Sequence, residues 1–318
     1  MLTKSLTEFS PEDHVLVGVS TSAPNTDALC EALANALQAT GFSFDGNSQK
    51  ILSGTDGTLA AEFSLRISSE VETARAAFSA NLSSFSGDWA LLPAHNRKKD
   101  VLICDMDSTI IAEECLDELA DFAGLKAEIS AITERAMAGE LNFEEALTTR
   151  VGMLAGLELS AISACYADRI HLNPGAQTLV ATMQAHGADC QLVSGGFTDF
   201  TSRVAAEAGF TSHHANTLEN DGTKLTGKVG LPILGREAKL DRLKAATEAR
   251  KVGLDAALCM GDGANDLAMI EAAGLGIAYR AKPIVAARAH AAIDHTDLTT
   301  ALFFQGYERS EFRTKPTD

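Results

Sequence analysis

The chain contains 318 residues, of which 46% are hydrophobic and 22% are charged. These fractions are close to the globular average, and they exclude a disordered, collagen-like or disulfide-scaffold chain. The formal net charge of −17 argues against nucleic acid or anionic membrane as a partner, because both require a positive face. The length predicts about two domains.

We find no pattern for export or membrane insertion in the sequence. Residues 1–20 contain only a short apolar cluster at 15–19, and no stretch approaches the roughly 18 uninterrupted apolar residues of a membrane helix. The six cysteines are scattered without a C-x-x-C pair, so we expect them to be reduced and buried. We therefore predict a cytoplasmic protein.

The first 95 residues predict a small α+β domain. Hydrophobic patterning indicates strands at residues 15–19, 42–44, 58–65 and 89–92, helices at 27–38 and 71–82, and a Gly-rich turn at 53–57. The resulting order βαββαβ, an antiparallel sheet covered by two helices, resembles the ACT-type fold of small-molecule sensors. No ligand motif accompanies this likeness, which therefore concerns the fold alone. We delimit an ACT-like domain at 1–95, followed by a linker at 93–99.

From Asp100 onward strands and helices alternate, which predicts a parallel sheet with helices on both faces. The expected strands span residues 101–104, 189–193, 256–260 and 276–278, and a β-hairpin is expected at 214–229. Residues 113–170 are helical in pattern and predict a cap over the carboxyl end of the first strand. We therefore delimit a second domain at 100–310, with its cap at about 113–172, and a charged tail at 311–318.

The first candidate site, Asp105-Met-Asp107-Ser-Thr, follows the apolar strand at 101–104 directly. Ligands bind at the carboxyl ends of strands in an open parallel sheet, and strand periodicity places both carboxylates on one side. Two carboxylates held so close resist joint ionisation unless a cation lies between them. Taken alone, the pair is also compatible with a solvated loop end or with the metal–nucleotide-sugar site of a glycosyltransferase.

Three further polar segments follow in the second domain. Ser194-Gly-Gly comes after the strand at 189–193 and before a helical run, where its N–H groups suit a phosphate. Gly261-Asp-Gly-Ala-Asn-Asp266 lies at the end of another strand and opens a helix, an arrangement that packing alone does not explain. Lys239 lies near the start of a helix and by itself is typical of a solvated helix face.

In their chain order (Asp105, Ser194, Lys239, Gly261), and at the ends of these strands and helices, the four sites resemble those of the haloacid dehalogenase superfamily of phosphotransferases. The likeness covers roughly residues 100–306. It implies an α/β fold: a Rossmann-like core with a parallel sheet and a helical cap inserted after the first core strand. A glycosyltransferase would have no use for the three later segments.

Within that superfamily, the cap resembles that of the phosphoserine phosphatases. Residues 137–151 match the family pattern M-x-G-x-x-x-F-x-x-A-L-x-x-R-V. The likeness implies that Glu114, Met137, Phe143 and Arg150 recognise serine. The residue types suit this role, because Glu114 offers an anion to an ammonium group and Arg150 offers a planar fork to a carboxylate. Taken alone, Arg150 is also typical of a helix surface, and Phe143 and Met137 are typical of a core.

The same resemblance implies hydrolysis of O-phospho-L-serine to L-serine and phosphate, the last step of serine biosynthesis. Asp105 is the implied nucleophile, which forms an aspartyl-phosphate, and Asp107 is the implied general acid and base. Mg²⁺ is the implied cofactor, with ligands from Asp105, Asp262 and the backbone carbonyl of Asp107. The remaining implied contacts surround the substrate: Ser194, Gly195 and Lys239 at the phosphoryl group, Asn265 within the substrate site, and Asp266 as a support for Lys239 or for a metal-bound water.

Two alternatives remain at this point. One is a related phosphatase or phosphotransferase that acts on another small phosphomonoester, and the pair of Glu114 and Arg150 argues for serine instead. The other is a regulatory protein in which the first 95 residues sense an amino acid and the second domain is a scaffold. Intact Asp105 and Lys239 argue against a scaffold. A mixed form stays open, in which an active enzyme carries an N-terminal domain that binds serine or mediates a homodimer.

Overall fold

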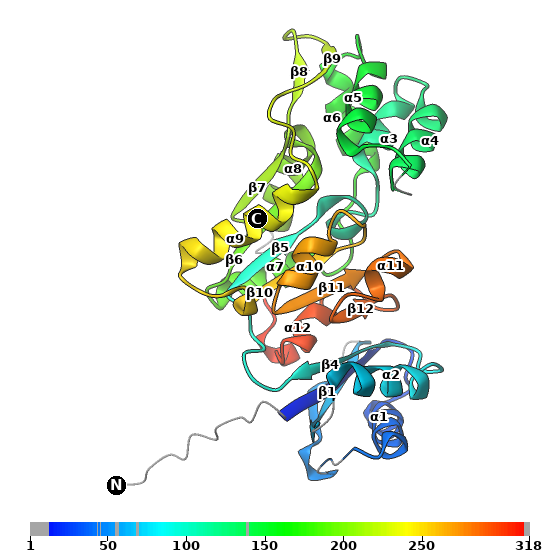
Figure 1. Cartoon of the computed structure of the whole chain (residues 1–318), viewed down its shortest axis with the longest axis vertical. Helices are drawn as coiled ribbons and strands as arrows, with labels where there is room; N and C mark the ends of the chain where they lie inside the picture. Colours follow the sequence, from blue (N-terminus) through cyan, green and yellow to red (C-terminus); the bar gives the residue numbers. More distant parts are fainter. Residues whose placement is uncertain are drawn as a thin grey trace. The chain divides into compact units, whose positions relative to one another are not determined.

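The computed structural model describes residues 13–42, 44, 46–54, 57–67, 70–137 and 140–314, and it divides the chain into two units (Figure 1). The first unit comprises the N-terminal part up to Lys98 together with His290–Phe312. The second comprises Lys99–Ala289 together with the residues from Arg313 onward. Within the described part of the chain, no helix is long and apolar enough to span a bilayer.

The first unit has the predicted order βαββαβ. Its elements are β1 (Asp13–Ser20), α1 (Thr26–Thr40), β2 (Lys50–Ser53), β3 (Leu59–Arg66), α2 (Val71–Asn81) and β4 (Asp88–Pro93). The strands form one antiparallel sheet in the order β2–β3–β1–β4. Helix α1 begins where the Asn25 side chain accepts a hydrogen bond from the N–H of Ala28, and it ends at Gly41, whose φ of 72° is left-handed.

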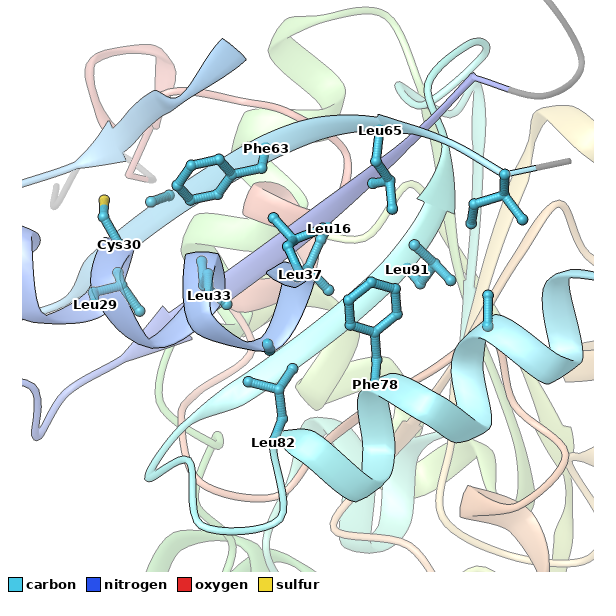
Figure 2. Packing of buried hydrophobic residues seen from close by; sticks show 14 residues of the cluster. Leu16, Leu29, Cys30, Leu33, Leu37, Phe63, Leu65, Phe78, Leu82 and Leu91 are labelled. Carbon is cyan, nitrogen blue, oxygen red and sulfur yellow. The ribbon is translucent and has the colours of Figure 1, made fainter. Parts of the chain in front are cut away.

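The core of the first unit lies between this sheet and its two helices (Figure 2). Leu16 from β1, Leu33 from α1 and Phe78 from α2 all have 0% exposure. Gly18 in β1 lets the helix approach closely, because a Cβ there would lie 2.7 Å from Cδ2 of Leu33. The apolar periodicity of the two helices therefore reflects burial against one face of the sheet.

The strand predicted at 42–44 is wrong. Phe44 makes only an isolated bridge with Leu65, Ser43 lies outside the described residues, and the strand before the turn is β2. The apolar residue Phe42 packs on the core without belonging to a strand, and its ring centroid lies 5.9 Å from that of Phe78. Strand β2 escapes sequence analysis because it has four residues at the sheet edge, and the first two of them are exposed.

A C-terminal segment belongs to the first unit. It contains β12 (Ala291–Ile293), α12 (Thr300–Phe304) and the turn 309–311. The carboxylate of Asp88 accepts hydrogen bonds from the backbone N–H groups of residues 294–296. Arg97 donates to Glu62 at 2.7 Å and to the carbonyl oxygens of residues 303 and 304. The predicted second domain, 100–310, includes most of this segment. The limits 1–95, 100–310 and 311–318 stay a prediction.

The second unit is an α/β fold around a parallel sheet, as predicted. Its strands are β5 (Val101–Cys104), β6 (Asp189–Phe197), β7 (Ser212–Asn216), β10 (Ala257–Gly261) and β11 (Leu275–Tyr279), in the order β11–β10–β5–β6–β7. All pairings between them are parallel. The accompanying helices are α7 (Ala176–Ala185), α8 (Thr198–Ala208), α9 (Arg236–Arg250), α10 (Leu267–Ala272) and α11 (Pro283–Ala286).

The cap is helical and lies between β5 and β6 in the chain, which confirms its predicted place. It consists of α3 (Cys115–Asp121), α4 (Lys126–Met137), α5 (Phe143–Met153) and α6 (Leu159–Arg169). Figure 1 shows these helices grouped at one end of the parallel sheet. The hairpin of β8 (Leu218–Asn220) and β9 (Leu225–Val229) also contacts this group, through β9 and α5.

Two local predictions in the second unit need correction. The predicted hairpin begins too early, because His214 lies in β7, a strand of the main sheet whose polar composition hides it. The strand predicted at 189–193 is too short, because Ser194, Gly195 and Gly196 belong to β6 itself, and α8 starts at Thr198. The chain stays extended there, with an irregular register between Val193 and Phe197.

Candidate active site

The loops at the carboxyl ends of β5, β6 and β10 meet the cap at a pocket of about 450 Å³. The predicted site residues that line it are Asp105, Asp107, Glu114, Phe143, Arg150, Ser194, Gly195, Asp262 and Asn265. Lys239 and Asp266 lie buried behind its floor, and the side chain of Met137 is outside the described part of the structure. Parallel strands place their carboxyl ends at one edge, so residues from distant segments converge here.

Lys239 joins two buried carboxylates. Its Nζ lies 2.6 Å from Oδ2 of Asp105 and 2.5 Å from Oδ1 of Asp266. Burial by itself lowers the pKa of Lys239, but the two carboxylates outweigh it and the pKa is raised. Burial raises the pKa of Asp266 to about 8, and Asp105 adds to this while Lys239 opposes it. The lysine therefore stays protonated and offsets charge at the pocket floor.

The segment Gly261–Asp266 folds tightly around the carboxylate of Asp266. The N–H of Gly263 donates to Oδ2 of Asp266 at 3.0 Å. A Cβ at Gly261 would lie 2.3 Å from Cγ of Asp266, and one at Gly263 would lie 2.3 Å from Oδ1 of Asn265. Both glycines are therefore required by close approach, which accounts for their place beside the acidic residues.

Asp107 is held at the pocket between the first loop and β6. Its carboxylate accepts hydrogen bonds from the N–H of Cys115 at 2.8 Å and from the hydroxyl of Ser194 at 3.2 Å. Burial raises the pKa of Asp107 to about 6; the Cys115 N–H opposes this shift and Asp105 adds to it. A carboxyl with that pKa can both give and take a proton near neutral pH.

Ser194 and the glycines after it form a close-packed wall. The N–H of Gly196 donates to Oγ of Ser194 at 2.8 Å. A Cβ at Gly195 would lie 3.3 Å from Cζ of Phe143, and one at Gly196 would lie 3.1 Å from Oδ2 of Asp107. Larger residues would therefore push on the cap aromatic and on the proposed acid.

Glu114 and Arg150 bring a potential anion and a cation to the cap side of the pocket. The hydroxyl of Ser108 donates to Oε1 of Glu114 at 2.8 Å, from a residue whose φ of 55° is left-handed. Burial raises the pKa of Glu114 to about 8, with a further contribution from Asp107. Arg150 is 9% exposed and donates to Oγ1 of Thr133 at 3.0 Å. These charges can bind the two ends of a zwitterion.

Among the described residues, one acidic group has the spacing of a metal site. Carboxylate oxygens of Asp105, Asp262 and Asp266 lie within 4.8 Å of one another. Burial raises the pKa of Asp262 to about 6, and Asp105 adds to that shift. The set contains two of the predicted ligands, Asp105 and Asp262, and adds Asp266; the third predicted ligand is the backbone carbonyl of Asp107, which is not a side-chain group. Buried oxygen ligands with surplus negative charge fit a hard divalent cation such as Mg²⁺.

Sequence analysis missed several residues that shape the pocket. Asn216 is 2% exposed, accepts from the N–H of Leu234 at 2.7 Å and donates to the carbonyl of Gly195 at 2.9 Å. Thr133 lines the pocket and contacts Arg150. No signal was available for Asn216, because it ends β7, a strand that the polar composition of residues 212–216 hides.

Comparison with known proteins places the second unit in a family. Residues 102–271 match the haloacid dehalogenase-like hydrolase family. A phosphoserine phosphatase of Streptococcus thermophilus is 46% identical over 200 residues, which cover 63% of this chain and 93% of that protein. A phosphoserine phosphatase of Streptomyces coelicolor is 38% identical over 250 residues, which cover 78% of this chain and 61% of that longer protein.

Solved structures agree with this assignment. A haloacid dehalogenase family hydrolase from Salmonella enterica serovar Typhi superposes with a TM-score of 0.79 at 30% identity, over 92% of this chain and 98% of that one. A phospho-aspartyl intermediate analogue of phosphoserine phosphatase has a TM-score of 0.62 at 35% identity, over 65% of this chain and 99% of that one. The chain therefore belongs to the haloacid dehalogenase-like hydrolase family, on the branch that contains the phosphoserine phosphatases.

Proposed function

We propose that this protein hydrolyses O-phospho-L-serine to L-serine and inorganic phosphate, the last step of serine biosynthesis. The observation that carries the proposal is the pocket itself, which combines Asp105 at its floor with Glu114 and Arg150 at its cap side. Asp105 suits the phosphate end of the substrate, Glu114 suits its ammonium group, and Arg150 suits its carboxylate. The names of the relatives support the same substrate.

Each charged group of the substrate has a partner in this arrangement. Arg150 binds the carboxylate and Glu114 binds the ammonium group, which favours the ionised form of Glu114. Phe143 lines the pocket and would close an apolar wall over the site, a role that the family resemblance also implies for Met137. Ser194, the N–H of Gly195 and Lys239 hold the phosphoryl oxygens, Asn265 hydrogen-bonds within the site, and Asp266 orients Lys239 through the ion pair of 2.5 Å.

Mg²⁺ is the proposed cofactor. Asp105 and Asp262 would hold it with their carboxylates and Asp107 with its backbone carbonyl, beside Asp266 in the acidic group. When bound, the ion neutralises negative charge on the phosphoryl group and on the carboxylates around it. Oxygen ligands of this kind suit Mg²⁺ better than zinc.

Two displacements then complete the reaction. Asp105 attacks phosphorus, so that a P–O bond to its carboxylate forms while the bond to the serine oxygen breaks, and Asp107 gives that oxygen its proton. The deprotonated Asp107 next takes a proton from a water molecule, which attacks the aspartyl-phosphate and releases phosphate and free Asp105. A pKa of about 6 suits Asp107 to both roles.

The test measures inorganic phosphate released from O-phospho-L-serine, with Mg²⁺ and then with EDTA, beside phosphothreonine, phosphoglycolate and fructose 6-phosphate. We expect a Mg²⁺-dependent rate that strongly favours phosphoserine. Asp105→Asn should stay folded and lose at least about 99% of the rate. A preference for another ester would remove the substrate assignment, while an active Asp105→Asn would remove the nucleophile.

The first unit supports a narrower proposal, that it binds serine or mediates a homodimer while the second unit catalyses. Its βαββαβ order and antiparallel sheet are those of an ACT-like fold. Gel filtration of the full chain with and without L-serine, together with the rate of hydrolysis, tests both roles. A chain that elutes as a monomer, and whose size and rate L-serine does not change, would refute them. We also place the reaction in the cytoplasm, which the six free, buried cysteines support.

A further inference from the structure

The arginine that faces the pocket is fixed along one edge only. Arg150 on α5 donates from Nη1 to Oγ1 of Thr133 on α4 at 3.0 Å, and from Nε to the carbonyl of Ala146 at 3.3 Å. Its Nη2 donates to none of the residues that the structure describes. The guanidinium therefore has a defined orientation and still keeps donors for a ligand.

Thr133 connects this arginine to a carboxylate on a third helix. Its hydroxyl lies 2.9 Å from Oδ1 of Asp117 on α3. A hydroxyl has one proton and two lone pairs, so it can accept from Arg150 while it donates to Asp117. The carbonyl oxygen of Ile129, at 3.1 Å, is the second acceptor within reach, and the carboxylate is both nearer and charged. Ser130 donates to the other oxygen of Asp117 at 2.7 Å. The two hydrogen bonds thus connect Arg150 on α5, through Thr133 on α4, to Asp117 on α3.

A hydroxyl between the two charges has a consequence for ligand binding. Burial lowers the pKa of Arg150, and Asp117 is the largest opposing influence. A carboxylate in direct contact would typically occupy two donors of the guanidinium fork. Thr133 occupies one, so Asp117 stabilises the buried cation without competing for the face that lines the pocket.

We propose that Thr133 and Asp117 are positioning residues that hold Arg150 open for the carboxylate of the substrate and thereby set the preference for amino-acid phosphates. This inference rests on the proposed function, because it assigns a carboxylate ligand to Arg150. The hydrogen bonds of Thr133 and Asp117 join them to Arg150, Ser130 and Ile129, and none of these bonds reaches Asp105. Their effect is therefore confined to substrates that carry a carboxylate.

The test compares Thr133→Val, which keeps the branched shape and removes the hydroxyl, with Thr133→Ser, which keeps the hydroxyl. Thr133→Val should raise KM for O-phospho-L-serine about tenfold, because a hydrogen bond to a charged group is lost. Its kcat should stay within about twofold, since binding rather than the chemical step is affected. Thr133→Ser should restore KM, which a purely steric role would not predict.

Two controls separate positioning from a general loss of structure. The substrate p-nitrophenyl phosphate lacks a carboxylate, so its kcat/KM should change less than about twofold in Thr133→Val. Thr148→Val makes the same change at an exposed position of α5 and should leave kcat/KM for both substrates unchanged. Asp117→Asn should raise KM for phosphoserine in the same direction, and it carries the test if Thr133→Val does not fold.

The outcomes distinguish this inference from the proposal on which it rests. A wild-type protein that does not hydrolyse phosphoserine overturns the proposed function. The positioning role alone is overturned if the wild type is active and Thr133→Val and Asp117→Asn lower kcat/KM equally for both substrates. It is also overturned if they lower kcat/KM for neither. Melting temperatures of all variants show whether each comparison is made on folded protein.

Discussion

Replacement of Lys239 tests the pocket floor most directly. The residue is 3% exposed, and its Nζ lies 2.6 Å from Asp105 and 2.5 Å from Asp266. Lys239→Met keeps most of the apolar stem and removes the charge. Loss of one partner from a buried ion pair costs about 3–5 kcal/mol, because an uncompensated charge stays behind. If the transition state loses this amount, kcat/KM falls by about 200- to 5000-fold.

The assay measures kcat/KM for O-phospho-L-serine and for p-nitrophenyl phosphate, with a melting curve for each variant. The kcat/KM values for both substrates should fall by the same factor, since Lys239 contacts the phosphoryl group that they share. Lys244→Met is the matched control, because it makes the same change at an exposed position of α9. A folded Lys239→Met variant within about tenfold of wild type on both substrates would refute this account of the floor.

Three other substitutions probe separate parts of the chain. Arg150→Ala should lower kcat/KM for phosphoserine by at least about a hundredfold and for p-nitrophenyl phosphate by less than about threefold, and equal losses would contradict carboxylate binding. Asn216→Ala should instead lower kcat/KM about tenfold for both substrates, because the carbonyl of Gly195 loses its hydrogen bond. A loss of kcat/KM for phosphoserine alone would argue against that role. Phe78→Ala should cost about 3–5 kcal/mol in urea unfolding, followed by fluorescence of the single tryptophan, Trp89, while the 40% exposed Ile51→Ala should cost less than about 1 kcal/mol.

The order of elements was largely predictable because hydrophobic periodicity is a local property. The parallel sheet, the helical cap and most of the βαββαβ unit follow from runs of apolar residues at strand or helix spacing. The errors occurred where that signal is weak. Strand β2 is short and lies at the sheet edge, and β7 has a polar composition. The end of β6 was missed because two glycines follow Ser194, and these glycines pack closely against Phe143 and Asp107.

The sequence alone determined the chemistry that this protein can perform, because the reactive residue types follow strands directly and parallel strands bring their carboxyl ends to one edge. Only the tertiary structure decided which of those groups touch. It places Asp266 with Asp105 and Asp262, pairs Lys239 with two carboxylates, and links Arg150 to Asp117 through Thr133. It also assigns residues 290–312 to the N-terminal unit. Such contacts join residues far apart in the chain, and they depend on burial and distance, which no local pattern records.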